Sequence, residues 1–134
     1  MIKNNDIRQG RHCLFVLQAN LVFLSRRRQG VFTPAILEQL QPIFASVCQD
    51  FGAELLAFQG GQGHVELRVS YPAKVSVSQL VNSLKGVSSR MIRKMDDADL
   101  QSKLWQGTLW SPSYFAGSCD ADSAQQMQQY IEQQ

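Results

Sequence analysis

Residues 54–71 read ELLAFQGGQGHVELRVSY, and this stretch decides the fold. Its two arms, residues 54–59 and 64–71, are short and rich in apolar residues, which is typical of β-strands. Between them, residues 60–63 (GGQG) can supply the positive φ angles of a tight turn. The stretch therefore predicts a β-hairpin.

A helix is predicted on each side of the hairpin. Before it, Thr33 and Pro34 have the form of an N-cap followed by a first-turn proline, and apolar residues recur with helical spacing over residues 34–51. Pro42 lies inside this helix, where its missing backbone N–H predicts a kink or a division in two. After the hairpin, residues 76–94 carry an apolar stripe and a basic opposite face, which predicts a second amphipathic helix.

The outermost segments add two strands and a last helix. Residues 12–24 (HCLFVLQANLVFL) predict a long buried strand. The aromatic residues of 104–119 suit a strand or an extended arm that crosses the core, and Pro112 makes it an edge or irregular strand. Residues 122–134 predict a short C-terminal helix. The order β-α-β-β-α-β-α indicates an α+β fold in which an antiparallel sheet has its two main helices on one face.

Composition narrows the class of protein. The chain has 134 residues, a mass of 15.1 kDa and 44% hydrophobic residues, which is typical of one domain spanning residues 1–134. No apolar run approaches the roughly 20 residues that cross a bilayer, and the first residues lack the apolar core of a signal peptide. We therefore expect a cytoplasmic protein without a membrane segment. Its isolated cysteines predict buried free thiols, at Cys13, Cys48 and Cys119.

Charge is distributed unevenly along the chain. Residues 1–94 hold twelve Lys and Arg against five Asp and Glu, whereas residues 95–134 hold one against six. Such a basic part suits a phosphate backbone, but charge clusters on helices and turns are usually solvated faces. The basic residues that are candidates for nucleic-acid contacts are Arg26, Arg27, Arg28, Lys85, Arg90 and Arg93.

Two groups of residues can carry chemistry. In the strand predicted at 64–71, alternation places His64, Glu66 and Arg68 on one face, where His64 and Glu66 can hold a divalent cation or Glu66 can pair with Arg68. In the last helix, Tyr130 and Gln134 lie one turn apart on one face. Tyr130 is either a nucleophile toward a phosphodiester or an ordinary packing tyrosine. The glycine-rich residues 60–63 lie in a hairpin instead of opening a helix, which argues against nucleotide hydrolysis.

These elements also occur in a recognisable order and spacing. They are 21–23 (LVF) before an arginine-rich turn, 64–67 (HVEL), 69–72 (VSYP), 84–90 (LKGVSSR), 104–105 (LW), 109–115 (LWSPSYF), and Tyr130, Ile131 and Gln134. Over residues 11–134 the chain resembles the TnpA-type transposases of single-strand insertion sequences and their REP-associated tyrosine transposase relatives. These are HUH enzymes with a single catalytic tyrosine.

The resemblance implies a ferredoxin-like or RRM-like fold with a C-terminal helix that bears the tyrosine. It also implies a homodimer with active sites shared between subunits, acting in DNA recombination on single-stranded DNA next to a hairpin. Tyr130 would be the nucleophile, forming a 5′-phosphotyrosine intermediate and a free 3′-OH. Magnesium or manganese would be held by His64, Glu66 and Gln134.

The chain departs from the family pattern around this site. Glu66 stands where the family has its second metal histidine, Gly63 where an acidic residue often precedes the first histidine, and Asn20 where a histidine is usual. Arg68 stands in place of an apolar residue. A carboxylate is a hard oxygen ligand that suits Mg²⁺ or Mn²⁺. The alternative function is a catalytically impaired, domesticated relative that binds hairpins in DNA or RNA through its basic residues.

Overall fold

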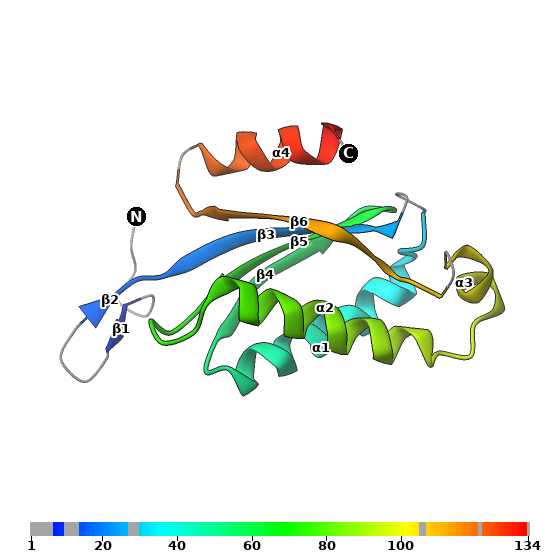
Figure 1. Ribbon diagram of the computed structural model, residues 1–134, viewed down its shortest axis with the longest axis horizontal. Coiled ribbons are helices and arrows are strands. Elements are labelled where there is room, and N and C mark those ends of the chain that lie inside the picture. The colour runs from blue at the N-terminus through cyan, green and yellow to red at the C-terminus, as the bar shows by residue number, and fades with distance from the viewer. Residues whose placement is uncertain (1–6, 10–13, 27–29, 105–106, 121, 134) are drawn as a thin grey trace.

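A four-stranded antiparallel sheet organises the domain (Figure 1). The computed structural model describes residues 7–9, 14–26, 30–104, 107–120 and 122–133. The strand order is β4-β5-β3-β6. The bounds of the strands are β3 Gln18–Ser25, β4 Glu54–Gly60, β5 His64–Ser70 and β6 Trp110–Ser118. This order, with every neighbouring pair antiparallel, confirms the predicted α+β fold and its hairpin β4–β5.

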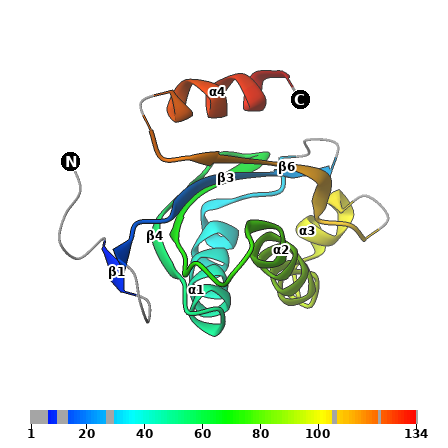
Figure 2. The ribbon, with the colours of Figure 1, turned by 60° about the vertical axis from the view of Figure 1, so that its left-hand side comes forward.

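Helices α1 (Pro34–Asp50) and α2 (Val77–Arg93) pack side by side on one face of the sheet (Figure 2). Both begin as predicted, because the hydroxyls of Thr33 and Ser76 accept hydrogen bonds from backbone N–H groups three residues on. Pro42 does not divide α1, which runs unbroken through it. The core lies between these helices and the inward residues of the sheet, where side chains such as Phe23, Phe44 and Leu84 are fully buried.

The opposite face of the sheet is covered by one helix, α4 (Ser123–Gln133), which packs mainly on β3 and β6 (Figures 1 and 2). A second, smaller apolar cluster forms here around Val22, Leu24 and Ile131. Alternation along β3 explains both clusters, because Leu21 and Phe23 point to α1 and α2 while Val22 and Leu24 point to α4.

The long strand predicted at residues 12–24 is wrong in its first half. The chain pairs as a separate ribbon of β1 (Arg8–Gln9) and β2 (Leu14–Phe15), and β3 begins only at Gln18. Arg8 ties this ribbon to the domain, since its guanidinium donates to Ser70 Oγ at 2.7 Å and to the Gly52 carbonyl at 2.9 Å. The composition of residues 12–24 correctly predicted extended structure. It did not predict that β2 pairs with β1 while β3 pairs within the main sheet.

The segment after α2 also differs from its prediction. A short helix, α3 (Ala98–Lys103), fills the segment between the second predicted helix and the last predicted strand, and the Asp97 carboxylate caps it by accepting from Leu100 N at 3.1 Å. The strand predicted at residues 104–119 is shorter, and β6 begins at Trp110. It lies at the sheet edge, as Pro112 predicted. Within the described ranges, no helix is long and apolar enough to cross a membrane.

Candidate functional site

Strand β5 divides its side chains between the two faces of the sheet. Val65, Leu67 and Val69 are buried in the main core. His64 and Glu66 are half-buried and Arg68 is exposed on the face that α4 partly covers. The predicted alternation is therefore confirmed, and it places one imidazole and one carboxylate together beside α4.

His64 and Glu66 form a mixed nitrogen and oxygen donor pair. His64 Nε2 lies 4.0 Å from Glu66 Oε2, with 22% and 16% of the two side chains exposed. One cation can touch both atoms, because bonds to Mg²⁺ or Mn²⁺ of about 2.1 Å span that separation after small side-chain adjustments. The donor set therefore fits such a metal. Within the part of the chain that the structure describes, no three His, Cys, Asp or Glu side chains gather as a possible metal cluster.

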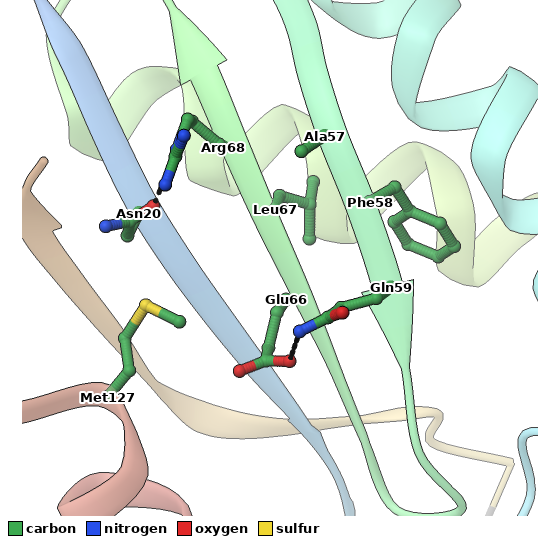
Figure 3. Close-up of a pocket in the computed structure, with 8 residues that line it drawn as sticks. All are labelled: Asn20, Ala57, Phe58, Gln59, Glu66, Leu67, Arg68 and Met127. Carbon is green, nitrogen blue, oxygen red and sulfur yellow. Dashed lines mark hydrogen bonds between the residues drawn. The ribbon is translucent and has the colours of Figure 1, made fainter. Parts of the chain in front are cut away.

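Two neighbours on the hairpin hold this pair. Gln59 of β4 faces Glu66 across the strands, and its Nε2 donates a hydrogen bond to Glu66 Oε2 (Figure 3). Gly61 lies against His64, where a Cβ atom would come within 2.8 Å of the imidazole Cε1. Sequence reasoning missed both residues. A four-residue turn at 60–63 would set Gln59 opposite His64, whereas the observed register pairs Gly60 with Val65 and so sets Gln59 opposite Glu66.

Arg68 does not pair with Glu66, so the expected alternative of a Glu66–Arg68 ion pair is wrong. Arg68 Nε donates to Asn20 Oδ1 at 3.4 Å (Figure 3). Asn20 in turn donates through Nδ2 to Ser123 Oγ at 2.8 Å, and both of these residues are buried. The polar group thus ties the start of α4 to the two central strands, and Asn20 has a structural role here.

Tyr130 lies on the same side of the sheet but over a different strand. Its hydroxyl is 2.9 Å from Ser113 Oγ of β6, and its ring packs on Phe115 with 5.8 Å between centroids. Among the described residues it shares no hydrogen bond with His64 or Glu66. Strand β3 separates β6 from β5, which explains why one chain does not bring the tyrosine to the donor pair. Gln134, the predicted third ligand, lies outside the described residues.

The arginine-rich turn follows β3 at the end of the sheet that carries His64. Leu24 pairs with His64, and Ser25 N donates to the Gly63 carbonyl at 2.9 Å. Arg26 comes next in the chain, and its N–H donates to the Leu109 carbonyl. Arg27 and Arg28 lie outside the described residues. The register therefore brings the start of this turn near the donor pair.

The basic residues of α2 lie in the layer on the opposite face of the sheet. Arg90 is exposed, and Arg93 donates to the carbonyls of Ser89 and Gly107. Lys85 is half-buried, and its ammonium donates to the Ser111 carbonyl at 2.7 Å and to two further β6 carbonyls at 3.4 Å. Burial lowers the pKa of Lys85. Its contacts give Lys85 a structural role at the start of β6.

The chain is similar to known proteins over nearly its whole length. Residues 13–134 match the family model described as transposase IS200 like. The ISDra2 transposase TnpA of Deinococcus radiodurans is 28% identical over 129 residues, which cover 96% of this chain and 91% of that protein. The transposase for insertion sequence element IS200 of Salmonella typhimurium is 24% identical over 123 residues, covering 92% and 80%.

Solved structures show the same likeness. A crystal structure of a transposase from Deinococcus radiodurans superposes with a TM-score of 0.86 at 28% identity, covering 95% of this chain and 97% of that one. The structure of a REP-associated tyrosine transposase bound to a REP hairpin superposes with a TM-score of 0.58 at 13% identity, covering 90% and 67%. At 13% identity, the similarity to this second structure concerns the fold alone.

Proposed function

Because this chain belongs to the IS200-like transposase family, we propose that it cleaves and rejoins single-stranded DNA at hairpin-marked ends, with Tyr130 as the nucleophile. The observation that carries the proposal is the His64–Glu66 donor pair, whose two atoms lie 4.0 Å apart on the sheet face that the tyrosine-bearing helix partly covers. An imidazole and a carboxylate placed in this way suit a cation that binds phosphate oxygens.

His64 and Glu66 would hold Mg²⁺ or Mn²⁺, with Gln134 as the third protein ligand. When bound, the cation would neutralise charge on the scissile phosphate and orient it. Glu66 suits this role although it replaces a histidine, because a carboxylate is a hard oxygen donor. The hydrogen bond from Gln59 supports the same assignment, since ligating carboxylates are commonly oriented by a second hydrogen bond.

The covalent step uses the phenol of Tyr130. Its oxygen gives up the proton to solvent and forms a bond to phosphorus, while the bond from phosphorus to the 3′ oxygen breaks. The departing oxygen takes up a proton and becomes a free 3′-OH, and the 5′ side of the DNA stays on the tyrosine. Attack by a 3′-OH on the phosphotyrosine reverses the exchange and rejoins the strand to a different end.

We infer a homodimer in which the tyrosine helix of one subunit completes the donor pair of the other. The position of Tyr130 supports this arrangement, because its hydroxyl contacts Ser113 on β6 and not the donor pair on β5. The arginines at 26–28 follow β3 at the end of the sheet that carries His64, where they suit the phosphates of the single strand. Arg90 and Arg93 lie on the other layer and suit the hairpin.

The test is a covalent adduct. Purified protein, Mn²⁺ and single-stranded oligonucleotides covering both flanks of its own gene are mixed and run on a denaturing gel, with Tyr130→Phe as the control. We expect an adduct in the wild type that is absent from Tyr130→Phe. Calorimetry with Mn²⁺ on the wild type and on His64→Ala tests the donor pair separately. A native-gel shift of hairpin DNA without any adduct would instead support the hairpin-binding function.

A further inference from the structure

Helix α4 covers only part of its own sheet face. It packs mainly on β3 and β6, so the outer part of this face, formed by β4 and β5, lies beside the helix (Figures 1 and 3). There the surface is hollowed into a groove of about 260 Å³. The lining residues that matter here are Asn20, Ala57, Gln59, Glu66, Arg68 and Met127.

The groove combines hydrogen-bonding groups with apolar surface. Arg68 is exposed, and its guanidinium, which reaches Asn20 through Nε and also interacts with the Cys119 thiol, keeps further N–H donors for a ligand. The amide oxygen of Gln59 accepts no hydrogen bond from the described residues and is available as an acceptor. Met127 on the α4 side and Ala57 on the β4 side supply apolar walls. A flat ring system with polar edges matches this set of groups.

Charge favours a neutral ring over a phosphate. The wall carries one carboxylate, Glu66, and one guanidinium, Arg68, so its two formal charges offset each other and give an anion no net attraction. An unpaired nucleobase is neutral and flat and carries donors and acceptors on its edges, and arginine pairs with or stacks on such bases. The groove is also too small for a paired helix. It therefore suits one base of a single strand.

The position of the groove relates it to the donor pair. Glu66 belongs to both, since it faces His64 at 4.0 Å and also lines the groove. A strand with a phosphate at the donor pair therefore has an adjoining nucleotide beside Arg68. We propose that the groove binds one unpaired nucleobase next to the scissile phosphate and that Arg68 recognises it. This inference rests on the proposed function, because it requires a single strand at the donor pair.

The experiment measures binding without cleavage. In a Tyr130→Phe background with Mn²⁺, fluorescence anisotropy gives the affinity for the flank oligonucleotides, with a single abasic nucleotide moved through the unpaired segment. We expect one abasic position to weaken binding about tenfold, as loss of one stacked or hydrogen-bonded base does. Arg68→Gln should weaken binding of the intact strand by a similar factor. In this variant, an abasic nucleotide at the sensitive position should no longer change the affinity.

Two further variants distinguish an effect of the groove on binding from effects of net charge or of protein stability. Ala57→Trp fills the groove without changing charge, and it should abolish the same abasic sensitivity. Lys74→Gln removes one exposed positive charge from the loop after β5 and should leave that sensitivity intact. Thermal unfolding checks all three variants. If Arg68→Gln does not fold, the Ala57→Trp result decides.

Three outcomes would overturn the inference. The first is a sensitive abasic position that still weakens binding in both Arg68→Gln and Ala57→Trp. The second is that the parent protein, Tyr130→Phe, shows no abasic position that weakens binding. The third is an Arg68→Gln effect that is equal for every oligonucleotide and reduces the salt dependence, which would indicate a phosphate contact. In all three cases the parent still binds the DNA, so the proposed function stands. A parent that binds no flank oligonucleotide would overturn both.

Discussion

The hydroxyl of Tyr130 lies 2.9 Å from Ser113 Oγ, so the tyrosine of α4 is docked on the edge strand β6. The segment of β6 that carries Ser113 is also bonded from the opposite face of the sheet. There Lys85 of α2 donates to the carbonyls of Ser111, Pro112 and Ser113. A lysine from one layer thus supports the serine that holds the tyrosine in the other.

Ser113→Ala should loosen α4 without unfolding the domain. The contact with Tyr130 is exposed, and a hydrogen bond of this kind contributes about 1 kcal/mol. Amide hydrogen exchange in α4 should therefore become about fivefold faster, while exchange in α1 stays unchanged. Ser118→Ala, at the other end of β6, is the matched control. Equal exchange in Ser113→Ala and the wild type would show that this contact does not hold the helix.

Lys85→Met should act on stability before it acts on DNA binding. Removing the ammonium takes away the short, part-buried hydrogen bond to the Ser111 carbonyl, which costs about 1 kcal/mol, while the exposed carbonyls of Pro112 and Ser113 can bond water. We expect a lower midpoint in urea unfolding, whereas Lys94→Met, an exposed site after the same helix, should leave it unchanged. If Lys85→Met kept full stability but reduced the salt dependence of hairpin binding, a phosphate contact would be the better description of Lys85.

Gln59→Ala should weaken metal binding. Its amide N–H holds Glu66 Oε2 beside His64, and loss of such an orienting hydrogen bond commonly lowers metal affinity at least tenfold, by about 1.4 kcal/mol. Mn²⁺ titration by calorimetry measures the effect. Gln62→Ala removes an exposed glutamine side chain from the same hairpin and should bind Mn²⁺ like the wild type. Tight binding in Gln59→Ala would mean that Glu66 needs no such support.

Thiol chemistry should separate Cys48 from Cys119. Burial raises the pKa of Cys48 from its ordinary 9.0 to about 11 and also raises that of Cys119, which is only half-buried. In a Cys13→Ser background, iodoacetamide should therefore label Cys119 first and Cys48 only on unfolding. Mass spectrometry of the labelled peptides measures the order, and faster labelling of Cys48 would contradict it.

The same shift at Cys48 has a consequence for stability. Its pKa in the folded state lies above that of the unfolded chain, so its contribution is complete below pH 9 and is lost as the pH rises toward 11. Cys48→Ala should show a smaller decline in stability over that range than the wild type. Urea unfolding at pH 8 and above pH 10 measures the difference.

Much of the local structure was predictable because its causes are local. The caps at Thr33 and Ser76, the helical spacing of apolar residues and the alternation along β5 each depend on residues a few positions apart. The long strand at 12–24 was mispredicted because strand composition does not name a partner, and the chain pairs first as β1–β2 before β3 begins. The cap at Asp97 was a local signal for α3 that the acidic composition of residues 96–99 obscured.

The sequence by itself determined that His64 and Glu66 share a face, because alternation is a property of any strand and needs no neighbour. Only the tertiary structure decided what meets them there. Gln59 reaches Glu66 through the hairpin register, and Asn20 joins Arg68 to a serine 103 residues away. Tyr130 rests on β6 because the order β5-β3-β6 puts a strand between it and the donor pair. The Gln59 contact follows from the register of a local hairpin, whereas the contacts of Asn20 and Tyr130 depend on how distant strands and helices pack together, which no short stretch of sequence encodes.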